Sequence, residues 1–171
     1  HGDALSVIVN DQAAVLQALA ARFPQLDIDR VGITGWSYGG TSSVAAVTLR
    51  PDVFKVAVAG APVTDWRDYD TYYTERYLDT PEVNAEGYAK SDLVARAAEL
   101  TRPLLLIHGT GDDNVYFSHS LKLADALFRA GKPFEFLPLI NFTHMVPDAL
   151  VQQRLQGRIA EFLFGHLGGP Q

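Results

Sequence analysis

Residues 30–40 read Arg-Val-Gly-Ile-Thr-Gly-Trp-Ser-Tyr-Gly-Gly, and this stretch decides which fold the chain can adopt. Its first half is short and β-branched and ends at a glycine, which is typical of a strand. The glycine-rich turn is followed by a helical run through Val44 and Val47 that stops before Pro51. The stretch therefore predicts a strand, a sharp turn that holds Ser37, and a helix.

Three more segments have the composition of strands buried on both faces of a sheet. They are nearly continuous apolar runs at residues 54–59, 103–108 and 134–139. Helical patterns separate them, and an amphipathic helix with Asn10 as its N-cap precedes the first strand. Because strands alternate with helices, we expect right-handed crossovers and one parallel sheet. The sequence predicts a single α/β domain over residues 1–171.

The carboxyl ends of the strands are where function is expected. Ligands of parallel sheets bind beyond these ends. The loops that follow the predicted strands lie at residues 36–40, 60–81, 109–117 and 140–147.

Composition narrows the chemistry. The 171 residues include no cysteine, which excludes disulfides, thiolate nucleophiles and thiolate metal sites. A net charge of −6 without a run of like charges gives no electrostatic footprint for nucleic acid or an anionic membrane. No apolar stretch approaches the ~20 residues of a membrane span. We expect a soluble protein with a small-molecule or peptide partner, and composition does not distinguish a bacterial cytoplasm from a periplasm.

Residues 35–39 form a G-x-S-x-G motif between the first strand and its helix, the context of a nucleophile elbow. Such a turn strains the serine backbone, and Gly35 and Gly39 are expected to lack side chains so that strand and helix can approach. The Tyr38 amide would then donate to a developing oxyanion at the helix N-terminus. We interpret Ser37 as a nucleophile; the alternative is a glycine-rich turn with an incidental serine.

A serine nucleophile requires a base and an acid that orients the base. In α/β-hydrolases the acid and then the histidine follow the serine, each after a later strand. Of the five histidines only His144 lies between the final strand and the final helix, whereas His108 ends a strand and is interpreted as structural. Asp112 and Asp113 both follow the preceding strand, and spacing alone does not choose between them.

Four motifs in sequence carry a wider resemblance. They are Gly-Trp-Ser-Tyr-Gly-Gly at 35–40, Ala-Pro-Val at 61–63, Tyr-Thr-Glu-Arg-Tyr at 73–77 and His-Gly-Thr-Gly-Asp-Asp-Asn-Val at 108–115. From about Asp11 to the last helix, the chain resembles the catalytic domain of the prolyl oligopeptidase family, in its dipeptidyl peptidase IV branch. The resemblance implies an α/β-hydrolase fold reduced to about its last four strands, without the family's β-propeller. It also implies that the acid is Asp112.

The resemblance implies a substrate pocket as well. In the family, the matching positions wall a small hydrophobic pocket for the residue before the scissile bond, typically Pro or Ala. These positions are Val63, Trp66, Tyr69, Tyr73 and Val115, and Asn114 matches a side chain that hydrogen-bonds a substrate carbonyl. A rigid aromatic box suits a proline ring because little rotamer entropy is lost. The alternative for the aromatic residues is ordinary core, and we keep that interpretation for Tyr77.

Two departures from the family pattern stand out. Residues 141–145 read Asn-Phe-Thr-His-Met, without the acidic residue before the histidine or the glycine after it. The family's upstream strands, its tyrosine oxyanion donor and its paired glutamates for a substrate amino terminus have no counterpart in these 171 residues.

The sequence therefore predicts a serine peptidase that cleaves after Pro or Ala through an acyl-enzyme on Ser37, with no cofactor and no metal. A carboxylesterase with the same triad and an inactive fragment that needs a missing portion are the alternatives. The expected partners are a peptide or small ester substrate, not nucleic acid or a membrane. Because the strand at 30–35 would have an unpaired edge, a homodimer or companion chain is also expected there.

Overall fold

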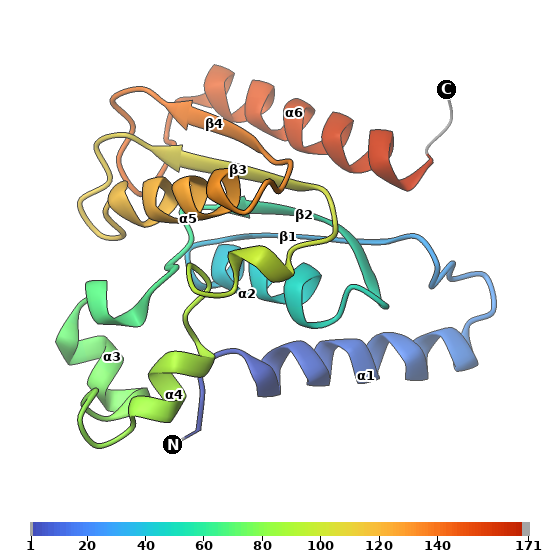
Figure 1. The fold of residues 1–171 in the computed structure, drawn as a ribbon. Coiled ribbons are helices and arrows are strands. Elements are labelled where there is room, and N and C mark those ends of the chain that lie inside the picture. Colours follow the sequence, from blue (N-terminus) through green and yellow to red (C-terminus); the bar gives the residue numbers. More distant parts are fainter. Residues whose placement is uncertain (1, 169–171) are drawn as a thin grey trace.

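The computed structural model describes residues 2–168, and a parallel sheet forms its centre (Figure 1). Within these residues the strands are β1 (Val31–Trp36), β2 (Phe54–Gly60), β3 (Leu104–Gly109) and β4 (Glu135–Leu139). They lie in the order β1-β2-β3-β4, and every neighbouring pair is parallel. The predicted α/β class is confirmed, and each predicted strand is found within one residue of its expected bounds.

Helices precede, connect and follow the strands. They are α1 (Ser6–Arg22), α2 (Tyr38–Leu49), α3 (Thr71–Leu78), α4 (Ala85–Lys90), α5 (Ser118–Arg129) and α6 (Ala149–Leu167), with short 3₁₀ turns η1 (Trp66–Asp68) and η2 (Ala97–Glu99). The predicted start of the first helix at Asn10 is wrong. The helix begins at Ser6, because the Asp3 carboxylate accepts hydrogen bonds from the backbone amides of Leu5 and Ser6. The expected loop at 60–81 also contains α3.

Two apolar layers hold the sheet between helices. On one face, Ala57, Ala59, Leu104 and Leu106 pack with buried residues of α1, α2 and α5. On the other face, Val56, Val58, Leu105 and Ile107 pack against α6. Figure 1 shows α6 on one side of the strands and α1 and α2 on the opposite side. Alternate residues of β2 and β3 therefore serve opposite layers, which explains why both strands are apolar throughout.

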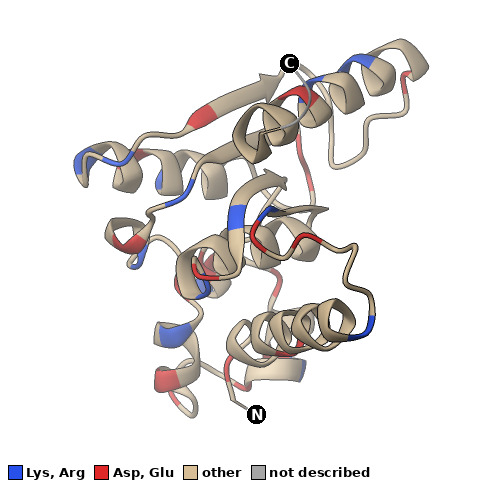
Figure 2. Ribbon diagram, turned by 90° about the vertical axis from the view of Figure 1, so that its right-hand side faces the viewer, with Lys and Arg blue, Asp and Glu red and all other residues tan. Residues whose placement is uncertain are grey.

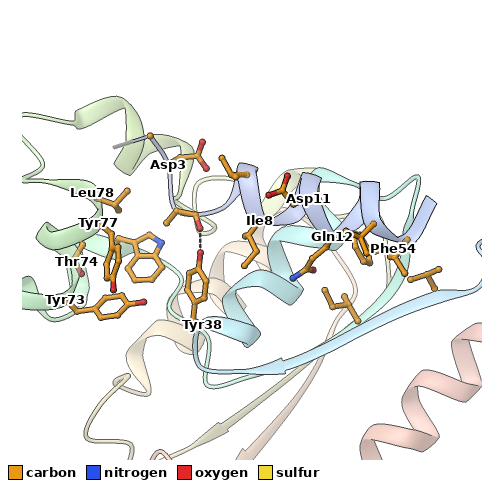
Figure 3. Close-up of a pocket in the computed structure, with 18 of the residues that line it drawn as sticks. Asp3, Ile8, Asp11, Gln12, Tyr38, Phe54, Tyr73, Thr74, Tyr77 and Leu78 are labelled. Carbon is orange, nitrogen blue, oxygen red and sulfur yellow. Dashed lines mark hydrogen bonds between the residues drawn. The ribbon is translucent and has the colours of Figure 1, made fainter. Parts of the chain in front are cut away.

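The outer side of β1 borders an open groove. Among residues 2–168, β1 pairs with β2 alone. Ser37 donates its amide to the Gly60 carbonyl on the β2 side, so by alternation Gly32, Thr34 and Trp36 direct their backbone groups to the open side. The adjoining groove has a volume of about 920 Å³ and runs from Phe54 to the tyrosines near α3 (Figure 3).

Charged side chains are distributed over the surface in mixed order. Figure 2 shows Lys and Arg interleaved with Asp and Glu along the helices and loops. Several lie in exposed ion pairs such as Lys90–Glu86 and Arg129–Asp125, which contribute little individually to the free energy of unfolding. Among the described residues, none of the helices is both long and apolar enough to cross a bilayer.

Candidate active site

Ser37 occupies a strained turn between β1 and α2. Its φ of 58° and ψ of −121° lie outside the conformations that L-residues usually adopt. The turn is held on both sides: the Ser37 amide donates to the Gly60 carbonyl at 2.9 Å, and the Ser37 carbonyl accepts from the Thr41 amide at 3.0 Å. A single residue thus ends the strand and begins the helix, as expected for a nucleophile elbow.

Close backbone contacts require glycine at positions 35 and 40, whereas the sequence predicts that requirement at positions 35 and 39. A Cβ at Gly35 would lie 2.5 Å from the carbonyl carbon of Gly39, and one at Gly40 would lie 2.3 Å from the Gly60 carbonyl oxygen. At Gly39 an added Cβ would meet no described atom within 4 Å. The expectation that Gly39 must lack a side chain is therefore wrong, and Gly40 carries that requirement instead.

Tyr38 is the first residue of α2. The first amides of a helix have no acceptor within the helix, so the Tyr38 N–H is available to a ligand beside Ser37. The Tyr38 side chain points the other way, into the groove, where its hydroxyl donates to the Ala4 carbonyl at 2.6 Å (Figure 3). Burial raises the pKa of this phenol, so the hydroxyl keeps the proton that it donates.

The structure brings Asp112 and His144 together. His144 Nδ1 lies 2.8 Å from Asp112 Oδ2. The other carboxylate oxygen of Asp112 accepts hydrogen bonds from the amides of Asn114 and Val115, each at 3.0 Å. Asp112 is only 5% exposed, whereas Asp113 is exposed. The two aspartates that spacing alone left equivalent are therefore distinguished by geometry, because Asp112 is the one that contacts His144.

A hydrogen bond from the neighbouring tryptophan brings the His144 loop to the elbow. Trp36, which precedes Ser37, donates its indole Nε1–H to the His144 carbonyl at 2.7 Å. The loop also lies against the end of β3, where the Gly111 amide donates to the Phe142 carbonyl at 3.0 Å. The unusual loop sequence is thus accommodated by contacts to β1 and β3. The role of Trp36 was missed because a bond across 108 residues leaves no local pattern in the sequence.

The residues expected to wall a pocket lie together. Val63, Trp66 and Val115 belong to one buried cluster, against which Tyr69 packs. The Trp66 ring lies 5.9 Å from that of Tyr69, edge-on, and 6.1 Å from that of Tyr73, stacked. These geometries are favourable for aromatic pairs.

Asn114 and Tyr77 each contact a tyrosine of the aromatic cluster. Tyr69 donates its hydroxyl to Asn114 Oδ1 at 2.8 Å, which leaves the Asn114 amide nitrogen as a donor. Burial raises the pKa of the Tyr69 phenol, so it remains protonated in this bond. Tyr77 is 55% exposed and lines the groove beside Tyr73, so its interpretation as ordinary core is wrong.

Comparison with known proteins identifies the family of the chain. A family model described as the prolyl oligopeptidase family matches residues 2–170. The chain belongs to the prolyl oligopeptidase family. The resemblance read from its motifs is confirmed.

Two of its relatives in this family are dipeptidyl peptidases. The chain is 49% identical over 167 residues to human dipeptidyl peptidase 8, covering 89% of this chain and 19% of the relative. It is 43% identical over 145 residues to venom dipeptidyl peptidase 4 of Vespula vulgaris, covering 81% and 18%. The chain thus spans about a fifth of the length of the curated relatives it matches.

Solved structures of the family share the fold. The crystal structure of Porphyromonas gingivalis dipeptidyl peptidase 4 superposes with a TM-score of 0.86 at 37% identity, over 92% of this chain and 22% of that one. A putative dipeptidyl aminopeptidase IV from Bacteroides ovatus gives 0.88 at 34% identity with the same coverages. The fold is therefore that of an α/β-hydrolase catalytic domain.

The glycine geometry predicts opposite outcomes for two substitutions in the elbow. Gly35→Ala should lower the free energy of unfolding by about 3 kcal/mol or prevent folding, because its methyl group would overlap backbone. Gly39→Ala should be neutral or raise it by up to about 1 kcal/mol, because alanine favours a helix where space is free. Urea denaturation of the two variants measures the difference. Equal losses at both positions would contradict the geometry.

Proposed function

We propose that the chain forms the catalytic part of a serine peptidase in which Ser37, Asp112 and His144 are the triad. The observation that carries the proposal is the His144–Asp112 hydrogen bond beside the strained serine turn. In such a triad a buried carboxylate holds the imidazole in the tautomer whose Nδ1–H donates to it. The free Nε2 can then accept the serine proton.

The proposed reaction proceeds through an acyl-enzyme. Ser37 Oγ attacks the substrate carbonyl carbon while its proton passes to His144 Nε2. The Tyr38 amide donates to the oxyanion that forms. The C–N bond then breaks, and His144 returns the proton to the leaving amine. Water, deprotonated by His144, attacks the ester carbonyl and releases Ser37 with its proton restored.

A small apolar residue, proline or alanine, is proposed to precede the scissile bond. The support is the cluster of Val63, Trp66 and Val115 with the stacked ring of Tyr73, a rigid apolar box. Flat aromatic faces pack on a pyrrolidine ring with little loss of side-chain entropy. Asn114, whose oxygen is occupied by Tyr69, offers its amide N–H to a substrate carbonyl.

A fluorophosphonate probe tests the triad. The probe should label wild-type chain at Ser37, and Ser37→Ala should remove both labelling and hydrolysis. Asp112→Asn should lower kcat by about 10⁴-fold, because the amide no longer holds His144 in the productive tautomer.

Asp113→Asn serves as the matched control, since it makes the same chemical change one residue away on an exposed side chain. Its kcat should stay close to that of the wild type. Labelling that survives Ser37→Ala, or equal losses in the two aspartate variants, would overturn the assignment.

Substitutions at two adjacent tyrosines test the specificity of the proposed pocket. Tyr73→Ala should lower kcat/KM for an Ala-Pro anilide relative to an anilide with a larger residue at that position, because the stacked wall is lost. Tyr72→Ala is the control, as Tyr72 on the same helix is 83% exposed. A lower melting temperature without any change in the preference for proline over a larger residue would instead indicate that Tyr73 is ordinary core.

A short acyl nitrophenyl ester measured in parallel distinguishes a peptidase from a carboxylesterase.

The open side of β1 is proposed to bind a further strand, from a second copy of the chain or from a companion polypeptide. Unpaired amide and carbonyl groups beside an apolar groove favour strand addition. At micromolar concentration, light scattering should show association, and hydrogen exchange should show protected amides at Gly32 and Thr34. Thr34→Pro, which removes one free N–H from this edge, should reduce both effects. A stable monomer with rapid exchange at these amides would exclude the proposal.

A further inference from the structure

A buried histidine outside the proposed triad contacts its acid. His108, near the end of β3, is 0% exposed. Its Nε2 lies 2.8 Å from the Val115 carbonyl oxygen and 3.2 Å from Asp112 Oδ2. Its Nδ1 lies 2.7 Å from the hydroxyl of Ser120 on α5. Both ring nitrogens therefore have polar partners, as buried polar groups require, and one of these partners is the acid of the proposed triad.

These partners determine where the proton of the ring lies. The Val115 carbonyl and the Asp112 carboxylate can only accept, so Nε2 must carry the hydrogen. Nδ1 is then the acceptor, and the Ser120 hydroxyl donates to it. Burial lowers the pKa of His108 against the opposing effects of the Val115 bond and Asp112, and the ring is neutral at pH 7.

We propose that His108 is a positioning residue that holds Asp112 in the orientation from which it binds His144. Its Nε2–H donates to the Val115 carbonyl at 2.8 Å and makes a second, longer contact with Asp112 Oδ2 at 3.2 Å. A single ring thereby fixes the carboxylate and the turn at residues 112–115, and Ser120 anchors the ring to α5. The inference rests on the triad assignment proposed above, and it goes beyond it by giving the acid a support from β3.

The hydrogen bonds of Asp112 explain why this support matters. Oδ1 accepts two backbone amides, and Oδ2 lies against both His144 and His108. A carboxylate held at both oxygens cannot rotate about its Cβ–Cγ bond without breaking at least one contact. The donor from His108 also withdraws negative charge from Oδ2, which weakens its attraction for a protonated His144.

The consequence is a specific change in pH dependence. Without the His108 donor, Asp112 should stabilise the protonated form of the base more strongly. The acidic limb of the kcat/KM profile should then move to higher pH by about half a unit to one unit. The titratable groups that face His108 are Asp112, His144 from the β4–α6 loop and His119 on α5.

Two substitutions of His108 distinguish the roles of its two ring nitrogens. In His108→Asn the amide reaches only the Nδ1 position, so it can still accept from Ser120 but cannot donate to Asp112. In His108→Gln the amide reaches the Nε2 position and restores that donor. We expect His108→Asn to move the acidic limb upward and to lower kcat about 10- to 100-fold with little change in KM, and His108→Gln to recover most of both.

His119→Asn is the matched control for burial. His119 is 1% exposed and accepts a hydrogen bond at Nδ1 from the Thr64 amide at 3.2 Å. The structure gives it no contact with Asp112 among the described residues. This variant should lower the melting temperature as much as His108→Asn does, yet leave the acidic limb unchanged. The same melting loss in both, with neither the limb nor kcat altered in His108→Asn, would overturn the proposal.

Nitrogen-15 NMR of the imidazole rings tests the proposal without any substrate. Wild-type chain at neutral pH should show His108 with its proton on Nε2, and the resonance of the proton between His144 and Asp112 should move in His108→Asn, because Asp112 has lost one of the contacts that hold it. A proton on Nδ1, or an unmoved His144 signal, would refute the positioning role even in a chain without activity. Conversely, absence of fluorophosphonate labelling with the expected NMR spectra would refute the catalytic function alone.

Discussion

The structure depends on a close approach of backbone to backbone where β1 meets α2. Gly35 lies against Gly39, and Gly40 lies against the carbonyl of Gly60 at the end of β2. Any side chain at Gly35 or Gly40 would push the helix away from the sheet. The strained conformation of Ser37 costs on the order of 1–3 kcal/mol. Burial of the α2 residues from Gly40 to Val47 offsets this cost, because the helix packs fully only if it starts immediately after the strand.

The same constraint positions the polar groups. Since α2 begins at the carboxyl end of β1, the Tyr38 amide lies at the edge of the sheet where the loops after β3 and β4 also begin. Parallel order places those loops side by side, and the backbone of residues 109–111 contacts residues 139–142 directly. A buried carboxylate and a histidine from two loops therefore meet without a long side-chain reach. This arrangement requires Gly109, where an added Cβ would lie 2.4 Å from the Phe142 carbonyl oxygen.

The sequence predicts the strands well, because burial on both faces produces continuous apolar runs that turn residues interrupt. It fails for the start of α1, where Asp3 caps the helix from outside its expected span. Spacing alone does not distinguish Asp112 from Asp113, because adjacent residues in a turn differ in direction rather than in spacing. The contacts of Trp36 with the His144 loop and of His108 with Ser120 are also absent from any local pattern. Such bonds are determined by strand order, which a helix or strand period does not encode.

Tyr38 connects the proposed catalytic centre with the open groove. Its amide lies beside Ser37, its ring lies 5.9 Å from that of Trp66, and its hydroxyl is bound to Ala4. The N-terminal segment is itself tied to the region around α4, because the Ala4 amide donates to the Ser91 hydroxyl and Asn84 donates to the Gly2 carbonyl. A strand that occupies the groove would pack along this same side chain. The open groove beside β1 and the start of α2 therefore share one residue, Tyr38.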